Sequence, residues 1–138
     1  MGTKGNKGFT LIELVLVITI LGILAVAALP SFINVSTQAR QASRDGVVGA
    51  VRSGIALFRA NDLVVNGPPG NYPAALDGAA NAAASAANPI YGSVLQSAVA
   101  DGAWAKTAAD VYTFNDGTTT FTYTYVPATG AFTSPTAP

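Results

Sequence analysis

Glu13 has the most unusual setting in the sequence, because it is the single charge within the apolar run from Phe9 to Leu29. A carboxylate is costly in hydrocarbon, and it is less costly when a cation pairs with it. A disposable signal segment or a plain membrane anchor has no use for such a charge. A helix that packs against copies of itself can pair it with a cation on a neighbouring chain. The alternative is that Glu13 only snorkels to the membrane interface.

The rest of the composition offers little for other chemistry. The chain has 138 residues with no Cys and no His, and seven Lys and Arg balance seven Asp and Glu. The absence of Cys and His excludes imidazole and thiolate metal sites, Cys nucleophiles and His general bases. A zero net charge does not suggest a nucleic-acid partner. Asp101, Asp110 and Asp116 lack calcium-loop spacing. We therefore expect no enzyme, no cofactor, no metal site and no nucleic-acid partner.

The apolar run is long enough to cross a membrane. Its 21 residues would span roughly 31 Å as a helix, about one bilayer core. Lys4 and Lys7 precede it, which is the polarity of an inserted N-terminus whose head stays cytoplasmic. Three interpretations compete. The run is a secretory signal cleaved after Ala25-Val26-Ala27, a plain anchor, or a helix that is processed at its N-terminus and then packs against copies of itself.

The residues around Gly8 favour the third interpretation. The segment Lys7-Gly8-Phe9-Thr10-Leu11-Ile12-Glu13-Leu14 resembles the processing site of type IV pilins and of the related pseudopilins of type II secretion. The family pattern is a short basic leader ending in Gly, then Phe, then Thr-Leu-hydrophobic-Glu. Pro30 lies where the family often has a proline. The resemblance is strong from Lys4 to about Pro30 and is one of layout beyond it.

The resemblance implies a role for each residue of the motif. Gly8 would precede the cut made by prepilin peptidase, and Phe9 would become the new N-terminus and be N-methylated by the same enzyme. Glu13 would meet the Phe9 amine of a neighbouring subunit during assembly. The implied partners are copies of the chain in a helical filament, the peptidase, an inner-membrane assembly platform with its ATPase, and membrane lipid before assembly. The implied location is the inner membrane, then an extracellular pilus or a periplasm-spanning pseudopilus.

The helix that must position this motif is expected to run from Phe9 to Ala60. Pro30 removes a backbone donor and predicts a kink, and Gly22 weakens the local helix. The sequence fits two alternatives equally well: local melting of the helix between these two residues, or an ordinary proline kink at the membrane surface. Four apolar residues spaced three and four apart predict a helical face that holds the rest of the subunit: Val48, Val51, Ile55 and Phe58.

The middle of the chain is expected to be mostly irregular. Asn66 to Pro73 has strong turn chemistry, because it contains adjacent Gly, Pro and Asn residues. The Ala- and Asn-rich stretch from Ala74 to Asn88 reads as a surface loop with a helical turn or two. The stretch from Ile90 to Ala100 is predicted to be a short helix.

The last third changes to the alternation typical of strands. Thr120 to Val126 alternates aromatic residues with Thr, and Asn115-Asp116-Gly117 is a hairpin turn signal. A second turn and a short strand from Ala131 to Ser134 complete an antiparallel meander. One face should pack on the long helix through five aromatic residues: Tyr112, Phe114, Phe121, Tyr123 and Tyr125.

The sequence therefore predicts an α+β protein, a long N-terminal helix packed on a small antiparallel β-meander. Residues 1–8 are the expected leader, 9–30 the transmembrane or filament-core helix, and 31–138 the globular head. The head divides into the second half of the helix (31–60), a loop region (61–109) and strands (110–134). The expected function is a structural filament subunit. The lack of Cys departs from the many type IVa pilins with a disulfide-closed loop and leaves a pseudopilin as the alternative. A secreted binding module is the third possibility.

Overall fold

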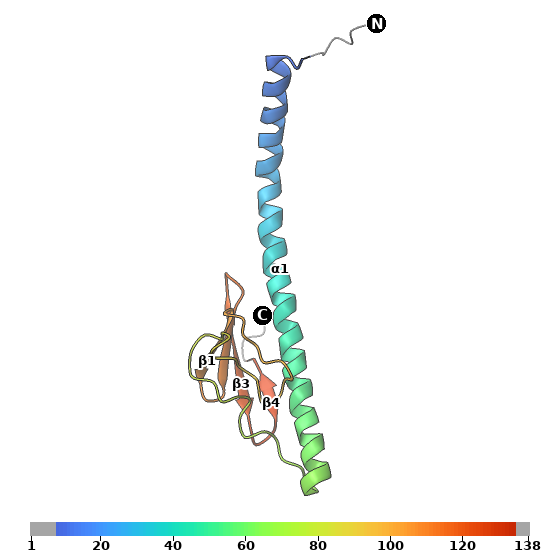
Figure 1. Cartoon of the computed structure of the whole chain (residues 1–138), viewed down its shortest axis with the longest axis vertical. Coiled ribbons are helices and arrows are strands. Elements are labelled where there is room, and N and C mark those ends of the chain that lie inside the picture. The colour runs from blue at the N-terminus through green and yellow to red at the C-terminus, as the bar shows by residue number, and fades with distance from the viewer. Residues whose placement is uncertain (1–7, 135–138) are drawn as a thin grey trace, which may run out of the picture. The chain divides into compact units, whose positions relative to one another are not determined.

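The computed structural model describes residues 8–134, apart from the side chain of Ile33. The elements in chain order are α1 (Leu11–Asn66), β1 (Trp104–Ala108), β2 (Val111–Asn115), β3 (Thr120–Val126) and β4 (Ala131–Thr133) (Figure 1). The chain divides into two compact units, residues 1–36 and 37–138. The predicted α+β class is confirmed. The leader residues Lys4 and Lys7 lie outside the described residues.

Helix α1 differs at both ends from the predicted helix of Phe9 to Ala60. It begins at Leu11 because Thr10 caps it, its side-chain oxygen accepting a hydrogen bond from the Glu13 N–H. It ends at Asn66 because Gly67 follows with a φ of 82°, in the left-handed region, and its N–H donates to the carbonyl of Leu63. The predicted end at Ala60 is therefore six residues too early.

The four strands form one antiparallel sheet in the order β1-β2-β3-β4. The β2–β3 hairpin turns at Asp116 and Gly117, where Gly117 has a φ of 100°. The predicted meander is confirmed for β2, β3 and β4. Strand β1 was missed, since residues 61–109 were expected to contain only loops and a short helix. Trp104 of β1 lies opposite Phe114 of β2, and both residues are buried in the core.

The core of the second unit lies between the sheet and the part of α1 that belongs to this unit (Figure 1). Val48, Val51 and Ile55 are buried as predicted, whereas Phe58 is 39% exposed and is not part of the core. The five aromatic residues predicted to face the helix are all buried. Gly54 is required for close approach, since a Cβ there would collide with the carbonyl oxygen of Val94.

The stretch from Ile90 to Ala100 is not the short helix that the sequence predicted. Ile90 and Val99 exchange backbone hydrogen bonds of 2.9 Å in an isolated antiparallel bridge. Tyr91 has a φ of 62°, a left-handed conformation that a helix does not permit. Its N–H donates to the side chain of Asp77, 2.9 Å away, instead of to a helical carbonyl. A tertiary contact therefore overrides the local preference.

Candidate functional site

The predicted processing junction lies outside the helix. Gly8, Phe9 and Thr10 have no regular secondary structure and precede α1 directly. The Phe9 side chain is 90% exposed. The peptide bond between Gly8 and Phe9 is therefore not sequestered by helical hydrogen bonds, and an enzyme could reach it in an extended conformation.

Glu13 and Thr10 form a reciprocal cap at the start of α1. The Thr10 N–H and hydroxyl both donate to Glu13 Oε2, at 3.0 and 2.9 Å. The Glu13 N–H donates in return to Thr10 Oγ1 at 3.3 Å. This is a capping box, in which a Thr and a Glu three residues later satisfy backbone donors at a helix N-terminus. The sequence analysis missed this contact, although the Thr-x-x-Glu spacing is its signature.

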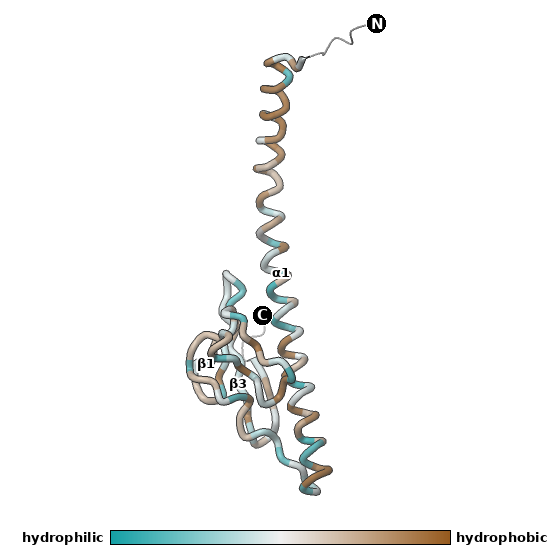
Figure 2. Tube along the Cα trace, viewed as in Figure 1, coloured by the Kyte–Doolittle hydropathy of each residue, from teal (hydrophilic) through white to brown (hydrophobic). Residues whose placement is uncertain are grey.

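From Leu14 to Leu29 the surface of α1 is apolar on every side apart from Thr19. Figure 2 shows that hydrophobic residues predominate in this stretch of the helix. Its large hydrophobic residues from Leu11 to Leu29 are all exposed. By length and composition this helix can cross a membrane, a property that a signal sequence shares. Apolar surface on every side of a helix is typical of one surrounded by lipid or by other helices. Glu13 is the only charge on this part of the described chain.

Gly22 and Pro30 both lie inside α1, which is continuous through them. A Cβ at Gly22 would meet no atom within 4 Å. A kink at Pro30 and local melting between these residues in a bundle of such helices both stay predictions. All five predicted site residues lie in the first unit: Gly8, Phe9, Glu13, Gly22 and Pro30. Among the described residues, the hydrogen bonds of the Glu13 carboxylate go only to Thr10.

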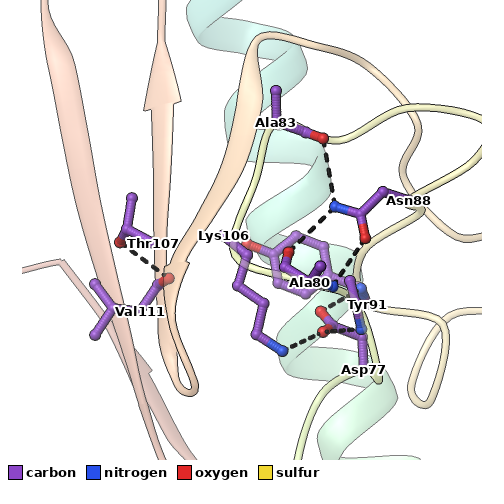
Figure 3. Close-up of polar contacts among 9 residues, drawn as sticks. Asp77, Ala80, Ala83, Asn88, Tyr91, Lys106, Thr107 and Val111 are labelled. Atoms are coloured by element: carbon purple, nitrogen blue, oxygen red, sulfur yellow. Dashed lines mark hydrogen bonds and ion pairs between the residues drawn. The ribbon is translucent and has the colours of Figure 1, made fainter.

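The second unit contains a buried ion pair that the sequence analysis did not identify. Lys106 Nζ of β1 lies 2.6 Å from Asp77 Oδ1, and their side chains are 7% and 2% exposed (Figure 3). The N–H groups of Ala79 and Tyr91 donate to the same carboxylate at 3.0 and 2.9 Å. The pair therefore ties the irregular segment after α1 to the first strand of the sheet. No local pattern marks two residues 29 positions apart as partners.

The electrostatics of this cluster favour a charged Asp77. Burial by itself raises the pKa of the Asp77 carboxyl, but the hydrogen bonds from Lys106 and from the Tyr91 N–H outweigh it and hold the pKa below its usual value. The hydroxyls of Tyr91 and Tyr112 are buried without a hydrogen-bond partner among residues 8–134. Burial raises the pKa of both phenols, and the negative charge of Asp77 adds to the effect. This cluster is a fixed structural anchor, since Asp77 is ionised and the phenols are neutral near pH 7.

Asp116 anchors the β2–β3 hairpin to α1. Its Oδ2 accepts from Gln41 Nε2 at 2.9 Å, and its Oδ1 accepts from the N–H groups of Thr118 and Thr119. The Gln41 bond, followed by these backbone bonds, holds the pKa of Asp116 far below its usual value. Within residues 8–134, no three acidic, His or Cys side chains gather where they could hold a metal ion.

Two comparisons with known proteins find a similarity, and the family model places it at the N-terminus of the chain. The family model of the prokaryotic N-terminal methylation motif matches residues 3–29. The type IV narrow pilus major component PilA5 of Thermus thermophilus is 53% identical over 51 residues. Those residues make up 37% of this chain and 44% of that relative, so the match spans less than half of either protein. No solved structure gives a significant match. The chain therefore carries a type IV pilin-like N-terminus.

Proposed function

We propose that this chain is a structural subunit of a type IV pilus-like filament and not an enzyme. The observation that carries the proposal is the exposed apolar stretch of α1 from Leu11 to Leu29. Glu13 is the only charge in this stretch, and the non-helical Gly8–Phe9 junction lies just before it. The methylation motif matches this same segment. Prepilin peptidase would cut between Gly8 and Phe9 and methylate the new amine. The chain would then be stored in the inner membrane until assembly.

Assembly would move the apolar part of α1 from lipid into the core of a filament of identical subunits. Helices gain little from hydrophobicity alone when they leave lipid for one another. Packing and the pairing of Glu13 with the Phe9 ammonium of a neighbour would therefore set the register, while an inner-membrane platform and its ATPase supply the work. Gly22 and Pro30 are the proposed points of local melting or kinking in the filament.

Two related functions share this N-terminus. A pseudopilin of type II secretion would use the same processing and assembly, and the Cys-free sequence is compatible with it. The similarity to a pilus major component favours the extracellular pilus. Electron microscopy of material sheared from cells separates the two functions, because a pilus subunit yields surface filaments and a pseudopilin does not. Deletion of a pseudopilin instead causes a defect in protein secretion.

The mature N-terminus tests the proposal directly. We expect the mature protein to begin at Phe9 and to carry one extra methyl group on its amine. Intact-mass and peptide mass spectrometry of the protein from its own cells would measure both features. A mature start at Ala28 would instead identify a secreted module released by signal peptidase, and would overturn the filament proposal.

A further inference from the structure

We propose that Arg52 closes the free edge of the β-sheet and thereby keeps a second copy of this chain from adding a strand there. The free edge is the outer side of β4, the last strand of the sheet. The unpaired backbone groups of an edge strand are a ready template for pairing with another chain. The inference concerns the head by itself, and it goes beyond the proposed function without depending on it.

The opposite edge of the sheet is closed by the backbone of the chain itself, where residues 82–84 run beside β1. The Ala84 N–H donates to the Trp104 carbonyl at 2.8 Å. The Lys106 N–H donates to the Ala82 carbonyl at 3.0 Å. Within residues 8–134, no strand or isolated bridge lies beyond β4 in the same way. The β4 side is therefore the edge at which another chain could pair.

The backbone of β4 directs the N–H and the C=O of Phe132 toward this free edge. Tyr125 of β3 lies opposite Phe132, and the Tyr125 N–H donates to the Asp110 carbonyl on the β2 side. Opposite residues of an antiparallel pair alternate between those that bond to each other and those whose backbone groups point apart. Since Tyr125 bonds toward β2, the backbone groups of Phe132 point away from β3 and out of the sheet.

Arg52 of α1 occupies the carbonyl at the centre of this edge. Its Nε donates to the Phe132 carbonyl at 3.0 Å, a contact between residues 80 positions apart. Arg52 is exposed, and among the described residues it forms no ion pair. The Phe132 ring is buried and stacks on Tyr123 with 5.4 Å between the ring centroids. The core therefore fixes the edge strand, and an uncompensated cation is bound to its middle residue.

This contact opposes strand addition in two ways. An added strand needs the Phe132 carbonyl as an acceptor, so it must first displace a charge-assisted hydrogen bond. Two copies that pair edge to edge would also bring their two Arg52 guanidinium groups together, and like charges across a strand pair are destabilising. Charged side chains protect the edges of natural sheets in this manner. Here the charge comes from the helix, because β4 itself has the uncharged sequence Ala131-Phe132-Thr133.

The test uses the full chain, purified in detergent micelles and studied over a series of protein concentrations. Hydrogen exchange with mass spectrometry measures the protection of the β4 amides, since an added strand would bind the Phe132 N–H. Association through the apolar helix leaves this exchange unchanged. Arg52→Met and Arg52→Ala remove the cap, whereas Arg52→Lys keeps a cation that can donate to the carbonyl. Arg40→Met is the control for the loss of a helix cation, and Gly54→Ala is the control for a less stable head.

We expect β4 exchange in the wild type and in Arg52→Lys to be independent of concentration. Arg52→Met and Arg52→Ala should gain protection in β4 as the concentration rises. Their half-maximal protection should need about tenfold less protein than any protection in Arg40→Met, a difference equivalent to about 1.4 kcal/mol. Concentration-independent exchange in both Arg52→Met and Arg52→Ala would overturn the inference. Equal protection in Arg40→Met or in Gly54→Ala would overturn it as well, because lost charge or lost stability would then explain the association.

Discussion

Replacing Lys106 by Met should destabilise the globular head more than any surface substitution. Met keeps the aliphatic stem of the lysine but removes its ammonium, so Asp77 loses the Nζ that lies 2.6 Å from Oδ1. Removing one partner of a buried ion pair leaves the other charge buried without compensation, which lowers the free energy of unfolding by about 3–5 kcal/mol. The N–H groups of Ala79 and Tyr91 still donate to the carboxylate, so we expect the lower end of this range.

The expected loss is large enough to measure by thermal unfolding. For a domain of about 100 residues, about 3 kcal/mol corresponds to a fall in Tm of about 15 °C. The protein for this experiment is the fragment 31–138, followed by circular dichroism. Arg40→Met is the matched control, because it removes an exposed cation from α1 and should change stability by less than about 0.5 kcal/mol.

A double substitution identifies the cause of the loss. Asp77→Asn combined with Lys106→Met removes both charges while an amide oxygen still accepts a backbone N–H. If a stranded charge causes the loss, the double variant should be more stable than Lys106→Met alone. A Tm for Lys106→Met within about 2 °C of wild type would refute the argument that the pair stabilises the head. A double variant no more stable than the single one would show that lost packing, and not the charge, is responsible.

The pH dependence of stability follows from the same pair. The folded-state pKa of Asp77 lies below its usual value of 3.8, so its contribution to stability is present above that value. The contribution is lost as the pH falls from about 4 toward the folded-state pKa. Lys106→Met removes one cause of the lowered pKa, and the variant should therefore show a weaker loss of stability over this acidic window than the wild-type head.

Three further predictions concern the helix and the head. Glu13→Ala should be processed at Phe9 yet fail to assemble. Glu13→Gln should have a milder assembly defect, because its side chain can still accept a hydrogen bond. Wild-type filament yield from Glu13→Ala in a shear assay would show that the pairing of Glu13 with Phe9 does not drive assembly. The fragment 31–138 should fold alone as a monomer with mixed helix and strand by circular dichroism, and an unfolded fragment would mean that the meander needs neighbouring subunits. Gly54→Ala should lower the stability of this fragment by about 1–2 kcal/mol, since its Cβ would meet the Val94 carbonyl. Gly49→Ala, where a Cβ meets no atom within 4 Å, should raise stability by up to about 1 kcal/mol in the same denaturation assay, and an equal effect of both would contradict the close approach at Gly54.

The sequence by itself determined the features that depend on local patterns. Three such features follow from residues close together in the chain: the apolar run with Glu13, the helical spacing of Val48, Val51 and Ile55, and the alternation of Thr and aromatic residues in β3. The resulting α+β class is confirmed, and so is the turn at Asn115-Asp116-Gly117. These predictions were correct because helix and strand periods are set by the backbone itself.

Only the tertiary structure decided the features that join distant residues. Strand β1 combines Trp and Thr, which favour strands, with two Ala and a Lys, which do not, so its local signal is weak. In the sheet it pairs with β2, and Trp104 lies opposite Phe114. The segment from Ile90 to Ala100 was predicted to be helical from the spacing of Ile90, Val94 and Leu95. In the structure the Asp77 carboxylate accepts a hydrogen bond from the N–H of Tyr91, which has a left-handed φ. Asp77 is in turn held by Lys106, a partner 29 residues away. Each of these outcomes depends on which groups the fold buries together. A buried polar group forms a hydrogen bond with a partner that the fold brings close, however far apart the two residues lie in the sequence.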